Sequence, residues 1–192
     1  MSAAPDLIAV PDLRQACLGD VEEMAMMINR FAAQGLMLPK SPAELSRSFR
    51  EYVVLTGPDG VVACAGLRVY SPDLAEIVGL AVHEDWQGQG MGPCLVTQLV
   101  EEARRLGIKR VFAMALQDRF FHPLGFRTIP REWVPEKVAA DCRGCARRVG
   151  CKEIAVIADL DPSAAPLGPP PPPRARRVRE LTVISRMAGP RA

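Results

Sequence analysis

The chain has 192 residues, 48% of them hydrophobic and 24% charged, and its formal net charge is +2. This length suits one folded domain with an appendage and allows a sizeable hydrophobic core. No apolar run reaches the ~18 residues that a membrane helix needs, and Met1–Pro11 has no basic region followed by a long apolar stretch. We therefore expect a soluble, cytoplasmic protein without a membrane partner.

Positive charge and proline gather towards the C-terminus. Residues 161–192 contain six arginines and two acidic residues, a balance of +4, which leaves about −2 on residues 1–160. Five consecutive prolines, Pro169–Pro173, favour an extended polyproline conformation. We expect a flexible N-terminus over 1–11, a domain over 12–160 and a disordered tail. The arginines of the tail are either solvated or bind an acidic partner or RNA, whereas the charge of the domain does not favour nucleic acid.

The first part of the chain predicts one strand and two helices. Leu13–Ala16 has the pattern of a short strand, and Asp20 is a suitable N-cap for a helix that ends at Gln34-Gly35. The segment Ser41-Pro42-Ala43-Glu44 predicts a second helix, with a serine cap, proline at the first position and glutamate completing a capping box. Apolar residues at helical spacing predict the buried face of the first helix: Met24, Met27, Ile28 and Phe31.

The middle of the chain predicts three strands and a helix. Tyr52–Thr56 and Val61–Val69 read as a hairpin joined by Gly57-Pro58-Asp59-Gly60, and Leu74–Val82 is a third strand. A helix is expected over 93–106, with its buried face formed by Leu95, Leu99, Ala103 and Leu106.

The remaining elements complete an α+β pattern. Gly107 ends the helix, Lys109–Leu116 predicts a strand, Arg119–Leu124 a short helix and Glu153–Leu160 a last strand. The expected order is β-α-α-β-β-β-α-β-α-β, which predicts a three-layer α+β fold with a sheet flanked by helices.

Three glycines fall within five positions between the strand that ends at Val82 and the following helix. Gly88, Gly90 and Gly92 leave backbone N–H groups uncovered beside the positive end of the helix dipole, which favours binding of phosphate. A dinucleotide-binding motif is excluded because Pro93 stands where the spacing leads to its third glycine, and the chain has no Gly-Lys-Ser or Gly-Lys-Thr of a P-loop.

The pattern Gln87-x-x-Gly90-x-Gly92 resembles the acetyl-CoA pyrophosphate loop of the GNAT family of N-acetyltransferases, and the order of elements resembles that family over about residues 12–160. The resemblance implies the acyl-CoA N-acyltransferase fold, a mixed and mostly antiparallel sheet flanked by helices, with acetyl-CoA as co-substrate. The cofactor-binding residues that it implies are Leu80, Ala81, Val82, Gln87, Gly88, Gln89, Gly90, Met91, Gly92, Pro93 and Phe121.

Several stretches resemble short, single-domain bacterial amino-acid N-acetyltransferases of the N-acetylglutamate synthase type: 34–41, 73–77, 80–83, 107–112 and 120–126. The chain has no room for the amino-acid-kinase domain of the long synthases. The resemblance implies direct transfer of acetyl from acetyl-CoA to the α-amine of L-glutamate or L-glutamine, the first step of arginine biosynthesis. The expected partner is a small-molecule amino acid, and a homodimer is compatible with the sequence. Acetylation of another amine (a polyamine, a drug or a protein N-terminus) and a non-catalytic sensor of acetyl-CoA or metal remain the alternatives.

Acetyl transfer requires that the acceptor amine lose its proton and that negative charge on the thioester oxygen be stabilised. Glu76 is the one acid inside the strand that precedes the glycine loop, and we expect it to be the base, directly or through water; a structural carboxylate is the alternative. The resemblance implies that the backbone N–H at about Val82 stabilises the oxygen. Phe121 occupies the place of a proton-donating tyrosine of related enzymes, which leaves solvent or the adjacent His122 to protonate the thiolate.

Basic residues are candidates for the acceptor's carboxylates. The resemblance implies such a role for Lys40, with Arg68 as a second candidate. Near the last strand, where long synthases have a basic, serine-containing segment, this chain offers Arg143, Arg147 or Arg148 instead.

A cysteine-rich loop occupies residues 141–151. The spacing Cys142-x2-Cys145-x5-Cys151 suits a metal loop and argues against structural disulfides in a cytosolic protein. Zinc with a fourth ligand from water or a distant residue, an incomplete iron–sulfur site and reduced, metal-free cysteines are the alternatives.

Overall fold

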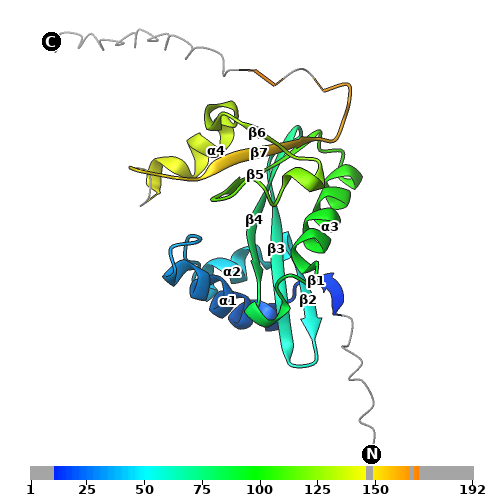
Figure 1. The fold of residues 1–192 in the computed structure, drawn as a ribbon, viewed down its shortest axis with the longest axis vertical. Helices are drawn as coiled ribbons and strands as arrows, with labels where there is room; N and C mark the ends of the chain where they lie inside the picture. The colour runs from blue at the N-terminus through cyan, green and yellow to red at the C-terminus, as the bar shows by residue number, and fades with distance from the viewer. Residues whose placement is uncertain (1–10, 146–148, 165–166, 169–192) are drawn as a thin grey trace, which may run out of the picture.

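The computed structural model describes residues 11–145, 149–164 and 167–168, and within them seven strands form one sheet with helices packed on it (Figure 1). The strands are β1 (Asp12–Gln15), β2 (Tyr52–Gly57), β3 (Gly60–Ser71), β4 (Leu74–Val82), β5 (Arg110–Ala115), β6 (Arg127–Ile129) and β7 (Ile154–Asp159). The α-helices are α1 (Val21–Ala33), α2 (Pro42–Ser48), α3 (Met91–Arg105) and α4 (Pro135–Ala140).

The sheet has the strand order β1-β2-β3-β4-β5-β7-β6. Its neighbours are antiparallel except for β4 and β5, which run parallel because α3 lies in the crossover between them. The prediction of a mixed, mostly antiparallel sheet flanked by helices is confirmed.

Two helical layers cover the sheet. Figure 1 shows α3 on one side and α1, α2 and α4 on the other. The buried side chains of α3 pack in one core with side chains of β2, β3, β4 and β5, whereas those of α1 and α2 pack with the other side chains of β2, β3 and β4. Because side chains alternate along a strand, the same three strands supply both cores.

Local sequence explains the first two helices. Met24, Met27 and Ile28 of α1 are buried, as their spacing predicts. The capping box of α2 forms as expected, since Ser41 Oγ accepts from the N–H of Glu44 and the Glu44 carboxylate accepts from the N–H of Ser41 at 2.7 Å.

Some predictions of elements were wrong. The strand β6 and the helix α4 were missed, because β6 has three residues and α4 six, too few to set up a hydrophobic period. Leu106 is 61% exposed instead of buried, because α3 ends at Arg105 and Gly107 turns the chain with a φ of +76°. The segment 119–124 contains only a 3₁₀ turn, His122–Leu124.

Asp20 stands at the start of α1 but does not cap it with its side chain. Its carboxylate instead accepts two hydrogen bonds from Arg14 of β1, each at 2.7 Å, and one from the N–H of Cys17. The Arg14 guanidinium holds the pKa of Asp20 at about 2, below its usual value of 3.8, against the opposing effect of burial. This pair ties the first strand to the first helix.

The predictions for residues 1–10 and for most of 161–192, together with those for Arg147 and Arg148, lie outside the described residues. Within the described ranges, no helix is both long enough and apolar enough to cross a membrane.

Candidate active site

Strands β4 and β5 run side by side and then separate. Leu74–Ile77 pairs with Arg110–Ala113, and beyond this register β4 continues to Val82 while β5 continues to Ala115. Residues of both strands beyond the paired part line one cavity. The opening of the sheet at this point therefore creates the candidate site.

Gly79 shapes β4 beside this opening. Its φ is +60°, and the register between β3 and β4 shifts at the same place. A Cβ on Gly79 would lie 2.7 Å from the hydroxyl of buried Tyr52, so even alanine would collide there. Both the backbone conformation and the close approach require glycine, and the resulting bulge redirects the end of β4.

The glycine loop lines the first of two neighbouring cavities, which has a volume of about 620 Å³. Gly88 and Gly90 have φ values of +72° and +84°, and Gly90 is the N-cap of α3. The loop is braced by its own glutamines: the Gln87 amide donates to the carbonyl of Val82 at 3.1 Å, and the Gln89 amide donates to that of Asp85 at 2.8 Å. The loop thus presents the start of a 15-residue helix to an open cavity, an arrangement that favours an anion.

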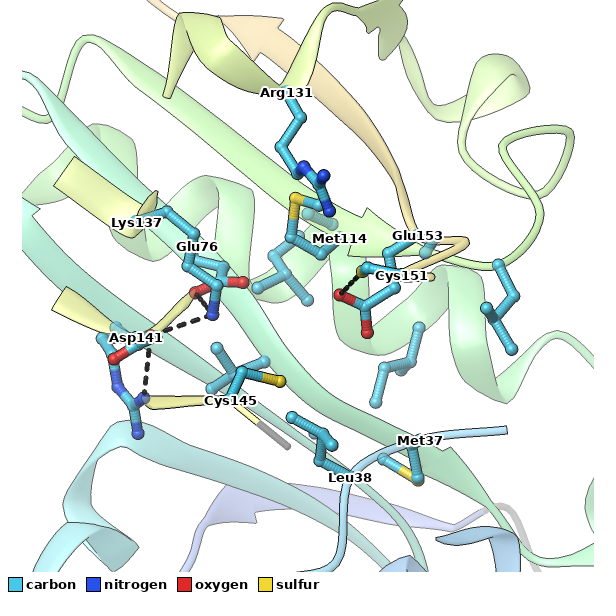
Figure 2. A pocket seen from close by; sticks show the side chains of 18 of the residues that line it. Met37, Leu38, Glu76, Met114, Arg131, Lys137, Asp141, Cys145, Cys151 and Glu153 are labelled. Carbon is cyan, nitrogen blue, oxygen red and sulfur yellow. Dashed lines mark hydrogen bonds and ion pairs between the residues drawn. The ribbon is translucent and has the colours of Figure 1, made fainter. Parts of the chain in front are cut away.

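The second cavity, of about 670 Å³, lies next to the first, because Leu36, Met37, Leu80 and Phe120 line both. Its wall comes from the connection between α1 and α2, from β3, β4, β5, from α4 and from the cysteine-rich loop (Figure 2). We call it the acceptor cavity. Its charged lining residues are Lys40, Arg68, Glu76, Arg131, Lys137, Asp141 and Glu153.

Glu76 lies on β4 and is 3% exposed. Its Oε2 accepts hydrogen bonds from the Tyr70 hydroxyl at 2.7 Å and from Lys137 Nζ at 3.0 Å. The same two donors also contact Asp141 Oδ2, at 2.5 and 2.9 Å, so Tyr70, Lys137 and both carboxylates form one cluster, the Glu76 cluster. No hydrogen bond to Oε1 of Glu76 is made by a described residue, which leaves this oxygen for a molecule in the cavity.

The Glu76 cluster places one hydroxyl proton between two carboxylates. The Tyr70 hydroxyl has a single proton but lies within hydrogen-bond distance of two carboxylates. Burial raises the pKa of Glu76, although Lys137 and Tyr70 oppose the rise. Burial opposes ionisation of Asp141 as well, but the hydrogen bonds from Tyr70 and Lys137, together with the charges of Lys137 and Arg68, lower its pKa. Glu76 is therefore the carboxylate that takes up a proton more readily, as a base requires.

Lys40 and Arg68 both line the acceptor cavity, as expected for residues that face a carboxylate. The backbone of Lys40 is held by the Asn29 side chain at 2.8 and 3.0 Å, and burial lowers the pKa of the ammonium. Arg68 is already paired, with Glu51 at 3.4 Å and with Asp141 at 3.8 Å. Lys40 thus has its charge available, whereas that of Arg68 is shared with protein carboxylates.

The predicted metal site is not supported. All three cysteines line the acceptor cavity, yet within 11–145, 149–164 and 167–168 no group of three His, Cys, Asp or Glu side chains is placed to hold a metal ion. The Cys151 thiol donates to Glu153 at 3.8 Å, and burial raises the pKa of Cys142. The described residues therefore give no support to zinc, because spacing along the chain does not by itself make thiols converge, and the described part of the loop forms one wall of the cavity.

Other predicted residues fall in different places. Phe121 is buried beside Phe120 and Phe126 and lines the acceptor cavity. His122 is exposed, with its Nε2 3.0 Å from the Thr128 hydroxyl, and does not line either cavity. Arg143 is also exposed and outside both cavities.

Sequence reasoning missed Tyr70, Arg131, Lys137, Asp141 and Glu153 as parts of the site. Arg131, Lys137 and Asp141 follow β6, in a stretch whose elements were not predicted. Tyr70 carried a usable signal, because it and Glu76 flank the turn between β3 and β4 and thus lie near each other on neighbouring strands.

Comparison with known proteins identifies the family. The profile of the acetyltransferase (GNAT) family matches residues 11–126, more than half of the chain. An uncharacterized N-acetyltransferase of Chlorobaculum tepidum is 31% identical over 148 residues, which are 77% of this chain and 96% of that protein. The chain therefore belongs to the GNAT family of acetyltransferases.

Amino-acid acetyltransferases are among its relatives. The amino-acid acetyltransferase of Neisseria meningitidis is 31% identical over 141 residues, 72% of this chain but 32% of that protein, so the chain spans about a third of its length. The structure of N-acetylglutamate synthase from Neisseria gonorrhoeae, complexed with coenzyme A and N-acetyl-glutamate, superposes with a TM-score of 0.72 at 29% identity. That match covers 80% of this chain and 36% of the other.

Proposed function

We propose that the protein transfers the acetyl group of acetyl-CoA to the α-amine of an amino acid, L-glutamate or L-glutamine, in a ternary complex. The observation that carries this proposal is the position of Glu76, a carboxylate with a raised pKa in a cavity next to the glycine-loop cavity. Membership of the GNAT family supports acetyl-CoA as co-substrate, and the named activities of the Neisseria relatives support an amino acid as the acceptor. In this proposal, the reaction takes place in the cytoplasm, at the start of arginine biosynthesis.

The two cavities divide the substrates between them. The backbone N–H groups of residues 87–92 in the glycine loop bind the pyrophosphate of acetyl-CoA. Leu80–Val82, which line the same cavity, run from this loop towards the acceptor cavity and receive the arm that carries the thioester. The acceptor enters the other cavity, where Lys40 faces a carboxylate.

The transfer itself needs one base and one stabilised oxygen. Glu76 takes a proton from the acceptor's ammonium, directly or through a water molecule, and the neutral nitrogen attacks the thioester carbonyl. The backbone N–H at Val82 stabilises the oxygen as it gains charge. The bond from carbon to sulfur then breaks, and the nitrogen gives its second proton to solvent, which leaves a neutral amide. Phe121 has no proton to donate and His122 lies outside the cavities, so solvent protonates the thiolate of coenzyme A.

The direct test is release of coenzyme A from acetyl-CoA with each of the twenty amino acids at millimolar concentration. Turnover with glutamate or glutamine alone supports the proposal. No turnover with any of them, while acetyl-CoA still binds, would contradict the amino-acid acceptor and favour another amine or a sensor.

A further inference from the structure

The acceptor cavity contains cations that no described residue neutralises. Four cations line it, and two of them, Arg68 and Lys137, are paired with protein carboxylates. Lys40 and Arg131 make no ion pair and no side-chain hydrogen bond with any residue of the described ranges. Arg131 lines the acceptor cavity but not the glycine-loop cavity.

The backbone that carries Arg131 is firmly anchored. Arg131 begins a 3₁₀ turn directly after β6, between Ile129 and Val134, which are both buried in the core around β5 and β7. Figure 2 shows its side chain extending into the cavity towards Met114 of β5. The same view places Met37 and Leu38, from the segment that leads to Lys40, at the far side of the cavity.

The charges of the lining residues sum to +1, since four cations face the carboxylates of Glu76, Asp141 and Glu153. A dicarboxylic α-amino acid has a net charge of −1 at neutral pH, which complements this lining. An unpaired guanidinium in a partly closed cavity is stabilised by an anion, and its planar fork fits the two oxygens of a carboxylate. The phosphates of the co-substrate belong to the other cavity, so the anion for Arg131 has to come from the acceptor.

We propose that Arg131 binds one carboxylate of the acceptor and, together with Lys40 of the same cavity, selects acceptors that carry two carboxylates. The inference rests on the proposed function, because it assumes that the acceptor occupies this cavity. Arg131 is then a determinant of acceptor specificity that is separate from the base, Glu76, and from the segment that carries Lys40.

The test is a double-mutant cycle in which one change is made in the protein and the other in the acceptor. The kinetics of wild type, Arg131→Gln and Arg131→Lys are measured with L-glutamate, with L-glutamine, which lacks the side-chain carboxylate, and with L-isoglutamine, which lacks the α-carboxylate. We expect Arg131→Gln to lower kcat/KM for glutamate by about 10- to 100-fold, mostly through KM, because a charge-assisted bidentate contact is lost. One of the two amides, glutamine or isoglutamine, lacks the carboxylate that Arg131 binds. With that amide as acceptor, Arg131→Gln should lower kcat/KM almost no further.

Arg131→Lys should recover part of the loss, since it keeps the charge without the fork. Arg105→Gln is the matched control, because Arg105 ends α3 and lines neither cavity; its kinetics should equal those of wild type. Thermal unfolding of each variant verifies that it folds.

Two results would overturn the inference. If Arg131→Gln leaves KM for glutamate unchanged, or lowers kcat/KM equally for all three acceptors, Arg131 does not bind a carboxylate, while the proposed function still stands on wild-type turnover of glutamate. If wild type acetylates only amines without a carboxylate, the inference and the proposed function fail together.

Discussion

The two cavities of the site are built in different ways. The glycine-loop cavity takes much of its lining from one continuous stretch, Leu80 to Pro93. The acceptor cavity takes side chains from positions as distant as Lys40 and Glu153, on several separate elements. A backbone binding site is thus encoded locally, whereas a side-chain binding site depends on how the elements pack. The following variants address one region at a time.

The substitution Glu76→Gln should have the largest effect on activity, and this effect should be confined to the acceptor cavity. The amide keeps the shape of the side chain but cannot take a proton, so we expect kcat to fall by about 10²- to 10⁴-fold, the usual contribution of a general base. The Kd of acetyl-CoA, measured by calorimetry, should not change. A variant with full turnover would show that Glu76 is structural, and a variant that loses cofactor binding would show that the two cavities are not independent.

Lys137→Met should change the pH dependence. Lys137 stabilises the charged form of Glu76 against burial, so its removal raises the pKa of Glu76 further. The base must be ionised, and activity is therefore lost on the acid side at a higher pH than in wild type, with a fall in kcat/KM of about tenfold at pH 7. Lys109→Met is the control, since Lys109 lies on the surface with Asp73 as its partner. An unshifted acid limb would contradict this role of Lys137.

The substitution Gly90→Ala should affect only the glycine-loop cavity. A Cβ at Gly90 meets open space, so the substitution costs only the strain of a φ of +84°, about 1 kcal/mol. We expect KM for acetyl-CoA to rise by about fivefold while KM for the acceptor stays the same.

Gly107→Ala is the matched control for this loop variant. It introduces comparable strain at a φ of +76° and also meets open space, but Gly107 lines neither cavity. It should lower the melting temperature without changing either KM. Equal changes in KM for the two variants would mean that the loop acts only through stability.

Asp20→Asn should leave both KM values unchanged and affect stability. The pKa of Asp20 is about 2 when folded and 3.8 in the usual case, so its contribution is complete above pH 4 and is lost as the pH falls from about 4 to 2. We expect the free energy of unfolding at pH 7 to fall by about 2 kcal/mol. Urea titrations should show that the free energy of unfolding decreases less in the variant than in wild type as the pH falls over the same range. Identical acid profiles would contradict the role of the Arg14 pair.

Much of the fold could be predicted because its signals are local. The bounds of β4, the capping box of α2 and the end of α3 at a glycine each depend on a few consecutive residues. β6 and α4 were missed, since elements of three and six residues are held by packing and not by their own periodicity.

For the site, the sequence alone determined the glycine loop, the acid on β4 and the family that they resemble, because these depend on spacing along the chain. Only the tertiary structure decided that Lys137, Tyr70 and Asp141 surround Glu76 and that Arg131 reaches the acceptor cavity without an ion-pair partner among the described residues. It also decided that the three cysteines line one wall of this cavity and that, in the part of the chain that the structure describes, they are not placed to hold a metal ion. The physical reason is that side-chain charges act over a few ångströms of space, and residues 61 or 71 positions apart come that close only when the sheet and α4 pack together.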